Sequence, residues 1–315
     1  MASLFHYTDA SGLIGILSSN SLFATDYRFM NDPSELGEAG KLIVPVFEAE
    51  IARLTPELTK KNFLRPEFYK ELGTRGHLLQ AESLYGAVIK AANNASPFFL
   101  FSFCRHDEKS DEYNHGLLSQ WRGYSSGGGF AIEFDESQLD KMLNEEIAAF
   151  AYAGYRTADV TYENHGEHFK AEGYQQIARE MLRKLFMSNG LDISEVTGKE
   201  QSLDKLFLDF LITAPFFKNT GFKEECEYRI SAVCIRKNKV PKGFGKEVKT
   251  IKFRSRGSMI TPYIDLFASL GKKLPLKSII VGPHLRQSEQ VEAAKLLVEA
   301  YDYDVPIKTS QIPLR

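Results

Sequence analysis

The segment from Pro97 to Cys104 reads Pro-Phe-Phe-Leu-Phe-Ser-Phe-Cys and constrains the fold more than any other part of the chain. Its residues are apolar at almost every position, without the alternation of a strand that has one solvated face. A short apolar run of this kind is typical of a strand buried on both faces. The segment therefore predicts a central strand, which other elements must cover on both sides.

Further strands are expected before and after this segment. Phe5–Thr8 predicts a first strand, which leads into a helix capped by Asp9 or Ser11, and Ser21–Thr25 predicts a second strand. Later strands are expected at 130–134, 150–162, 227–235, 246–253, 259–265 and 277–282, with a final helix at 287–300.

Helical patterns dominate two long regions, at about 35–95 and 137–215, with a break expected near 54–56 in the first. The chain contains no internal repeat and no obvious linker. We expect a single α+β domain over residues 1–315. Its strands would come from both ends and the middle of the chain, and the two helical regions would be insertions.

The composition, 43% hydrophobic and 25% charged, is typical of a globular protein, and the formal charge of −2 gives no general attraction to nucleic acid or anionic membranes. Cys104, Cys226 and Cys234 lack the spacing of a disulfide framework or a zinc knuckle. No signal peptide or run of about 20 apolar residues is visible. We expect a cytoplasmic protein with no membrane partner.

The motif Glu225-Cys226-Glu227 directly precedes a strand-like run from Tyr228 to Val233. Residues two apart on a strand project to the same side, so both carboxylates are expected to point the same way. Such a pair can polarise a nucleophile or stabilise a developing positive charge. The alternative interpretation is a solvated strand edge, where this pattern is common.

His6 lies near the start of the first expected strand. An imidazole there would hydrogen-bond a ligand hydroxyl from the wall of a cleft. The alternative is a buried histidine with its own partner, or a frayed chain end.

Residues 120–124, Gln-Trp-Arg-Gly-Tyr, contain the only tryptophan and precede a glycine triplet. Aromatic and guanidinium planes can stack on a flat ring, arginine can bind phosphate, and glycine lets the backbone approach a ligand. The alternative is that Trp121 anchors the core and the glycines form a hairpin loop.

Two further segments have a functional and a structural interpretation. Asp26, Arg28 and Asn31 would line a cleft after the second strand, or Asn31 and Asp32 would hold a turn. Residues 236–256 contain nine Lys or Arg and a single Glu. They would guide a nucleic-acid substrate, or protect a solvated edge strand from aggregation.

Several chemistries are disfavoured by the motifs. No Gly-Lys-Ser or Gly-Lys-Thr follows the glycine triplet, which disfavours a P-loop that hydrolyses ATP or GTP. The triplet is also not a GxGxxG motif that opens a helix after a strand, so a Rossmann site is not supported. Cys104, His106 and His115 lack the paired spacing of zinc ligands, and no nucleophile motif surrounds a serine. No metal is expected.

Five marks occur in order along the chain, at residues 6–8 (His-Tyr-Thr), 31–33 (Asn-Asp-Pro), 120–124, 221–229 and 281–283 (Val-Gly-Pro). In this combination the chain resembles ADP-ribosyltransferases of the His-Tyr-Glu type. More narrowly, it is similar to a largely uncharacterised bacterial family with the same signatures. The resemblance implies a core of two mostly antiparallel sheets with helical insertions, and NAD as the substrate.

The resemblance also implies catalytic roles. Glu227 would hydrogen-bond the ribose 2′-hydroxyl and stabilise the cationic transition state, and Glu225 would orient or deprotonate the acceptor. His6 would hold a ribose. Tyr124, or alternatively Tyr27, would stack on nicotinamide.

Arg122 or Arg28 would take the pyrophosphate, and the expected NAD-binding set is completed by Tyr7, Thr8, Gln120 and Trp121. Similar bacterial transferases act as toxins or in defence against phage. The implied partners are a nucleic-acid or protein acceptor and an antitoxin or other regulatory partner.

Two other functions compete with transfer. One is a non-catalytic sensor that uses the same cleft to bind a nucleotide or a phage protein. The other is a metal-dependent nuclease, in which Glu225 and Glu227 hold Mg²⁺ together with Asp26 or Asp32. No lysine at the diagnostic spacing follows the glutamate pair, which disfavours the nuclease.

Overall fold

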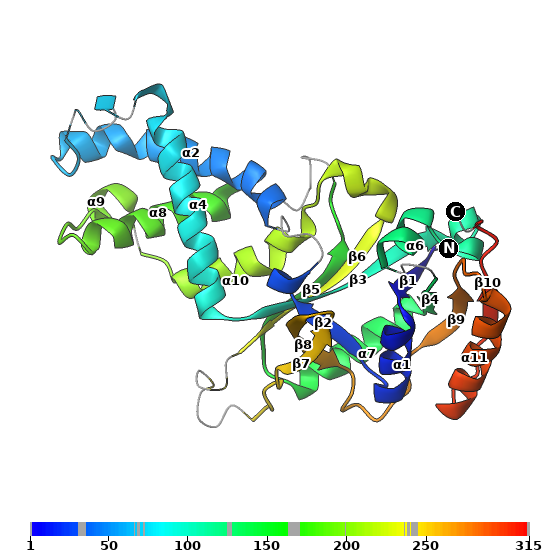
Figure 1. The fold of residues 1–315 in the computed structure, drawn as a ribbon. Coiled ribbons are helices and arrows are strands. Elements are labelled where there is room, and N and C mark those ends of the chain that lie inside the picture. Colours follow the sequence, from blue (N-terminus) through cyan, green and yellow to red (C-terminus); the bar gives the residue numbers. More distant parts are fainter. Residues whose placement is uncertain are drawn as a thin grey trace. The chain divides into compact units, whose positions relative to one another are not determined.

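The computed structural model describes residues 2–30, 36–65, 67, 70–71, 73–124, 128–162, 171–198, 200–235, 237, 240 and 245–313. The chain forms two compact units (Figure 1). The first unit comprises Met1–Met30, Phe99–Val160 and Thr220–Arg315, and the second comprises Asn31–Phe98 and Thr161–Asn219. The two helical regions expected as separate insertions therefore come together in one unit.

In the described part of the chain, ten strands form one sheet, whereas the sequence predicted two sheets. The strands are β1 (Ala2–Thr8), β2 (Leu22–Asp26), β3 (Phe98–Asp107), β4 (Phe130–Phe134), β5 (Tyr152–Asp159), β6 (Glu227–Cys234), β7 (Lys252–Arg256), β8 (Met259–Leu266), β9 (Leu276–Val281) and β10 (Ile307–Thr309). Their order is β10-β9-β4-β1-β3-β2-β8-β7, and β6 pairs with both β3 and β5. Among strand pairs with a described register, only β9 and β10 run parallel. The fold is mixed α/β with a large, mostly antiparallel sheet.

β3 confirms the central strand predicted from its apolar sequence, and three strands pair with it. β1 pairs with its C-terminal half as far as Cys104, and β2 pairs with its N-terminal half as far as Leu100. β6 runs along the other edge of β3 (Figure 1), where the Arg105 amide donates to the Cys226 carbonyl. The backbone groups of successive residues in a strand point to opposite edges, so those of Ser102 and Cys104 point away from β6. β1 and β2 therefore share one edge, and the sheet forks between them beside Ser102.

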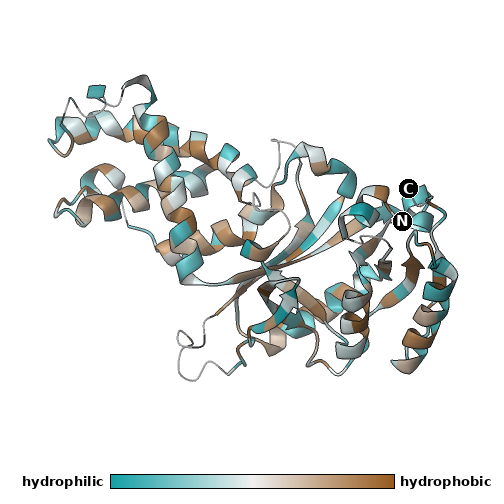
Figure 2. Ribbon diagram, in the orientation of Figure 1, coloured by the Kyte–Doolittle hydropathy of each residue, from teal (hydrophilic) through white to brown (hydrophobic). Residues whose placement is uncertain are grey.

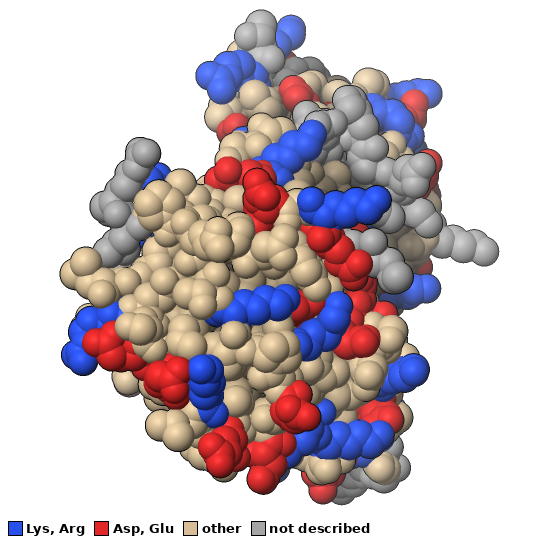
Figure 3. Space-filling view, turned by 90° about the vertical axis from the view of Figure 1, so that its right-hand side faces the viewer, with Lys and Arg blue, Asp and Glu red and all other residues tan. Residues whose placement is uncertain are grey.

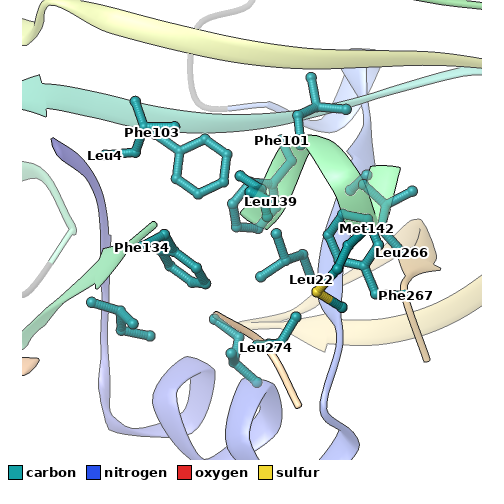
Figure 4. Close-up of a cluster of buried hydrophobic side chains, with 14 of the residues drawn as sticks. Leu4, Leu22, Phe101, Phe103, Phe134, Leu139, Met142, Leu266, Phe267 and Leu274 are labelled. Carbon is teal, nitrogen blue, oxygen red and sulfur yellow. The ribbon is translucent and has the colours of Figure 1, made fainter. Parts of the chain in front are cut away.

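Alternation along the central strands gives the sheet an apolar face. Phe101 and Phe103 of β3 join Tyr228 and Ile230 of β6 in one buried hydrophobic cluster, part of which Figure 4 shows. Leu139 packs into the same cluster from the helix that follows β4. Burying each such side chain contributes about 1.5–3 kcal/mol, so this apolar face supplies much of the stability of the first unit.

The opposite face of the same strands, between β6 and β7, carries many polar side chains among apolar ones such as Leu100 and Val233. The pairing register links the strands, because Thr25 pairs with both Leu100 and Tyr263, and Arg254 pairs with Thr261. We define the polar face by the side chains of Thr25, Ser102, Glu227, Arg229, Ser231, Arg254 and Thr261.

The helices of the first unit are α1 (Ala10–Ser19), α5 (Asp111–His115), α6 (Leu118–Tyr124), α7 (Glu136–Ala149) and α11 (Gln287–Ala300), with the 3₁₀ helices η1 (Tyr27–Phe29) and η4 (Thr220–Glu225). Asp9 caps α1 as predicted, because its carboxylate accepts from the Gly12 amide at 2.7 Å. The final helix, α11, matches the predicted range and lies beside β9 and β10 (Figure 1). The second expected insertion begins later than predicted, because α7 and β5 belong to the first unit.

The second unit is helical. It contains α2 (Gly37–Lys60), α4 (Gly76–Ala95), α8 (Ala171–Met187), α9 (Ser194–Thr197) and α10 (Leu203–Thr213), with η2 (Gly73–Arg75) and η3 (Ala214–Phe216). Hydrophobic and hydrophilic residues alternate along α2, α4 and α8 as in amphipathic helices (Figure 2). No helix in the described ranges is long and apolar enough to cross a membrane.

Two local predictions differ from the structure. The break expected near 54–56 is absent from α2, which continues through Pro56 and ends at Lys60 because packed residues such as Leu54 and Leu58 hold both sides of the proline. The strand expected at 246–253 begins only at Lys252, because the preceding residues are held by contacts outside the sheet ladder, including the buried Lys249–Glu146 ion pair. Residues 118–124 form a helix, and the turn expected at 31–35 lies outside the described residues.

Candidate functional site

Glu227 and Arg229 form a buried ion pair on the polar face. Alternate positions on β6 place the two side chains side by side. Arg229 Nε donates to Glu227 Oε1 at 2.6 Å, and Nη2 donates to Oε2 at 2.9 Å. Glu227 is 4% exposed and Arg229 0% exposed, so each charge depends on the other. The fork geometry of the guanidinium fixes the direction of the carboxylate.

Glu225 does not share a strand with Glu227. It ends η4, and the intervening Cys226 has φ of 42°, in the left-handed region. Strand alternation therefore does not apply to Glu225 and Glu227. The prediction that both carboxylates point the same way because they share a strand is wrong. A non-glycine residue in this conformation is uncommon and costs roughly 1 kcal/mol or more. The Cys226 amide closes η4 by donating to the Lys223 carbonyl at 3.2 Å.

The imidazole of His6 lies at the fork. It packs on the Phe101 ring with centroids 4.3 Å apart, and its Nδ1 lies 3.0 Å from the Ser102 carbonyl oxygen. That carbonyl points to the edge where β1 and β2 diverge. His6 as a residue is only partly buried, yet burial of its imidazole lowers the pKa from 6.5 to about 4.

The ring of His6 is therefore neutral at pH 7, and its contact with a carbonyl assigns the proton to Nδ1. Nε2 is then a hydrogen-bond acceptor, and no partner for it lies among the residues that the structure describes. This nitrogen can accept a hydrogen bond from a ligand hydroxyl. A neutral ring cannot neutralise a phosphate.

Arg254 is a residue of the polar face that the sequence reasoning did not single out. Its Nη2 donates to Thr25 Oγ1 at 3.0 Å, and its guanidinium lies 5.6 Å from the ring centroids of Phe23 and Tyr263. Its charge also acts on His6, where it favours the neutral imidazole. The available signal was the alternation in Lys-Phe-Arg-Ser-Arg at 252–256, which places the three basic side chains on one face of a strand.

Hydroxyls without partners also mark the polar face. The side-chain oxygens of Ser102, Ser231 and Thr261 are enclosed, but none has a hydrogen-bond partner within the described residues. Nearly all buried polar groups in proteins are hydrogen-bonded, so a run of such groups on three strands is unusual. The polar face is thus much less completely satisfied than the rest of the sheet.

Trp121 and Tyr7 belong to a second, smaller core. Trp121 is 4% exposed and donates through Nε1 to the His115 carbonyl at 3.0 Å. A side chain at Gly116, where φ is 77°, would collide with the indole. The Tyr7 hydroxyl accepts from the Leu117 amide at 2.7 Å and lies 2.8 Å from His106 Nε2. The geometry supports the anchoring interpretation of this tryptophan.

The remaining candidate residues lie elsewhere. Gln120 is buried on α6, whereas Arg122 and Tyr124 are exposed on it. Tyr27 and Arg28 lie on η1, where Arg28 is held by the buried Asp26 through bonds of 2.9 and 2.6 Å. Arg28 is therefore already neutralised.

Thr8 ends β1, and the structure does not bring the expected NAD-binding set into one cluster. His6 and Glu227 leave the sheet on different sides, since His6 packs with the aromatic rings of the apolar face. Both nevertheless flank β3 at the fork, with Arg254 acting on His6.

Other candidate sites are weaker. Within the described ranges, no group of three or more His, Cys, Asp or Glu residues could hold a metal ion. Cys104, His106 and His115 therefore do not form such a group. A cavity of about 410 Å³ in the second unit is lined mainly by apolar residues such as Leu84, Leu182 and Phe207.

Comparisons with known proteins give one partial match. Residues 120–230 match a family described as a protein of unknown function (DUF2971). The match includes Trp121, Glu225, Glu227 and Arg229, but not His6. No curated protein and no solved structure matches the chain.

Proposed function

We propose that the protein is an NAD-dependent ADP-ribosyltransferase with an ADP-ribosyltransferase-like core. The observation that carries the proposal is the imidazole of His6, which is neutral, fixed by the Ser102 carbonyl and has a free acceptor nitrogen at the fork of the sheet. A ribose hydroxyl is the donor that such a nitrogen suits. The carboxylate of Glu227, fixed by Arg229, is the second element that the chemistry requires.

NAD would supply an ADP-ribosyl group, with nicotinamide as the leaving group. The glycosidic C–N bond breaks with its electron pair on nicotinamide, and an acceptor nucleophile forms the new bond to the same ribose carbon. Glu227 would hydrogen-bond the ribose and stabilise the positive charge that develops. Glu225, at the end of η4, would take the proton of the acceptor. Tyr124 and Tyr27 remain the two candidates for stacking on nicotinamide.

The acceptor is proposed to be a nucleic acid, or otherwise a protein, in a toxin or phage-defence setting. The basic segment ends on the edge strand β7, where the exposed Lys252 and Arg256 favour a nucleic acid. On the surface drawn in Figure 3, basic and acidic side chains are interspersed, so that surface is no basic platform. Much of the rest of the basic segment 236–244 lies outside the described residues.

A second candidate is a non-catalytic nucleotide sensor, as weighed from the sequence. The observation that favours it is the burial of Glu227 against Arg229, on a different side of the sheet from His6. A sensor would bind a nucleotide through the fork and would not need the carboxylate to reach the ribose. A transferase releases nicotinamide from NAD, whereas a sensor binds the nucleotide without releasing nicotinamide.

The test is release of nicotinamide from NAD, and transfer of label from radiolabelled NAD, in the presence of a cell lysate separated into protein and nucleic-acid fractions. We expect wild type to transfer label and Glu227→Gln to lose about 10²–10³ in rate or more. Glu292→Gln on α11, an exposed glutamate paired with Lys295, is the matched control and should retain full activity.

Loss of activity in Glu227→Gln could reflect unfolding, because it removes the carboxylate that the buried Arg229 guanidinium contacts. The double variant Glu227→Gln/Arg229→Met removes both charges and should recover the wild-type melting temperature while remaining inactive. Transfer by the folded double variant would refute the role of Glu227. Tight NAD binding by wild type without nicotinamide release in any fraction would establish the sensor instead.

A further inference from the structure

Arg254 differs from other shielded arginines of this chain in lacking an anionic partner. Each of four others contacts a carboxylate at 2.5–2.9 Å: Arg105, Arg179, Arg183 and Arg229. No carboxylate lies within ion-pair distance of Arg254 among the described residues, and its single polar contact there is the Thr25 hydroxyl. Removing a guanidinium from water without an anion is unfavourable, so this position favours a charged ligand.

The surroundings of Arg254 intensify this imbalance. Burial lowers the pKa of Arg254 and the neighbouring charge of Arg256 lowers it further, against smaller opposing effects of Tyr263 and Asp9. The guanidinium remains charged at neutral pH, since arginine is not deprotonated in proteins. An anion at this point would relieve both effects.

The aromatic side chains around Arg254 fix its orientation. The guanidinium lies over Phe23 and Tyr263, and Nη2 is held by Thr25. The Nε and Nη1 groups have no partner within the described residues. A planar cation of fixed direction with free N–H groups is suited to phosphate oxygens.

The contact with Thr25 adds a second donor beside Arg254. The Thr25 hydroxyl accepts from Arg254 Nη2 at 3.0 Å, and its own O–H makes only a long contact of 3.5 Å to the Phe23 carbonyl, which a phosphate oxygen can replace. The site therefore offers a phosphate group both a charged and a neutral donor.

We propose that Arg254, assisted by Thr25, binds the diphosphate of the nucleotide substrate. This assignment rests on the proposed function, and it replaces Arg28 and Arg122, the phosphate-binding residues expected from the sequence. Arg28 is neutralised by Asp26, and Arg122 is exposed on α6.

The test compares ADP with adenosine, which lacks the phosphates, by isothermal titration calorimetry. Wild type is expected to bind ADP more tightly than adenosine. Arg254→Gln should weaken ADP binding about 10- to 100-fold while leaving adenosine binding unchanged, because only the charge-assisted phosphate contact is lost. Arg286→Gln, at an exposed arginine paired with Glu289, is the matched control and should behave as wild type.

Thermal stability separates a binding role from a structural role. If Arg254 serves ligand binding, Arg254→Gln should melt at or above the wild-type temperature without ligand, and ADP should raise the melting temperature of wild type only. Arg254→Lys keeps the charge without the fork geometry and should retain part of the ADP preference. A variant that melts lower and keeps the ADP preference would overturn the assignment.

Two further outcomes separate this assignment from the proposed function. An ADP preference that depends on Arg254, without nicotinamide release, supports the phosphate site and removes the transferase. Nicotinamide release with wild-type parameters in Arg254→Gln supports the transferase and overturns the phosphate site. Arg254-dependent binding of a single-stranded oligonucleotide, with no such dependence for ADP, also overturns it.

Discussion

The two faces of the central sheet are built from neighbouring residues of the same strands, yet they serve different purposes. On β3, Phe103 enters the main hydrophobic cluster, whereas Ser102 next to it presents an enclosed hydroxyl without a partner in the described part of the chain. On β6, Tyr228 is in the cluster, and Glu227 and Arg229 on either side of it form a buried ion pair. The apolar face is optimised for packing, while the polar face keeps charges and hydroxyls that contribute little to folding.

This difference explains why the polar face is the candidate site. Buried ion pairs are often no more stabilising than apolar residues of similar size, and unpaired hydroxyls are unfavourable. The polar face has a buried ion pair on β6 and enclosed hydroxyls without described partners on β3, β6 and β8. The stability of the fold alone does not require these groups. Binding of a polar ligand is the physical reason that suits such a face.

The largest contrast is expected from two adjacent residues of β3. Phe103→Ala should lower the free energy of unfolding by about 3–5 kcal/mol, because it leaves a cavity in a close-packed cluster. Ser102→Ala should change it by less than about 1 kcal/mol or raise it, because it removes an enclosed hydroxyl with no partner. Urea denaturation of both variants measures this. A large loss in Ser102→Ala would show that its hydroxyl is satisfied, and would end the comparison of the two faces.

An intermediate effect is expected from pH. Burial lowers the pKa of His6 and of His106 to about 4. The unfolded chain takes up protons at these residues near pH 6.5, while the folded chain does not. The stabilisation that comes from the two neutral imidazoles is therefore fully present above pH 6.5 and is lost as the pH falls toward 4. The loss is expected to be on the order of 2 kcal/mol, allowing for partial solvent access.

Chemical denaturation at several pH values measures this dependence. In His106→Gln the slope between pH 6.5 and 4 should be shallower than in wild type. Identical slopes would show that His106 does not remain neutral in the folded protein. NAD binding should also weaken as His6 is protonated, because its acceptor nitrogen is lost.

The smallest effect is expected at Trp121, the only tryptophan of the chain. Trp121→Phe should cost about 1 kcal/mol, mainly through loss of the hydrogen bond to the His115 carbonyl. Since the indole is buried in the second core, its fluorescence should be blue-shifted and NAD should leave it unquenched. Saturable quenching by NAD would instead show that Trp121 lies at the NAD-binding site, as the resemblance implied.

Local patterns predicted several elements well. The apolar run at 97–104 predicted a central strand, and Asp9 predicted the start of α1, because burial and capping depend on neighbouring residues. The polar face was only partly predictable. The position of Glu227 before a strand singles it out, but no local pattern shows that Arg229 fixes its carboxylate. The relation expected between Glu225 and Glu227 failed because Cys226 adopts a left-handed conformation that no local pattern predicted.

The sequence by itself determined the strands, the amphipathic helices and the side chains that alternate between faces, because these follow from residue spacing over a few positions. Only the tertiary structure decided that β1 and β2 share an edge of β3, that His6 binds the Ser102 carbonyl, and that Arg254 reaches Thr25. Thr25 and Arg254 are 229 positions apart in the chain. Such contacts arise from the pairing of distant strands, where the register of the whole sheet, and not the local pattern, sets which side chains meet.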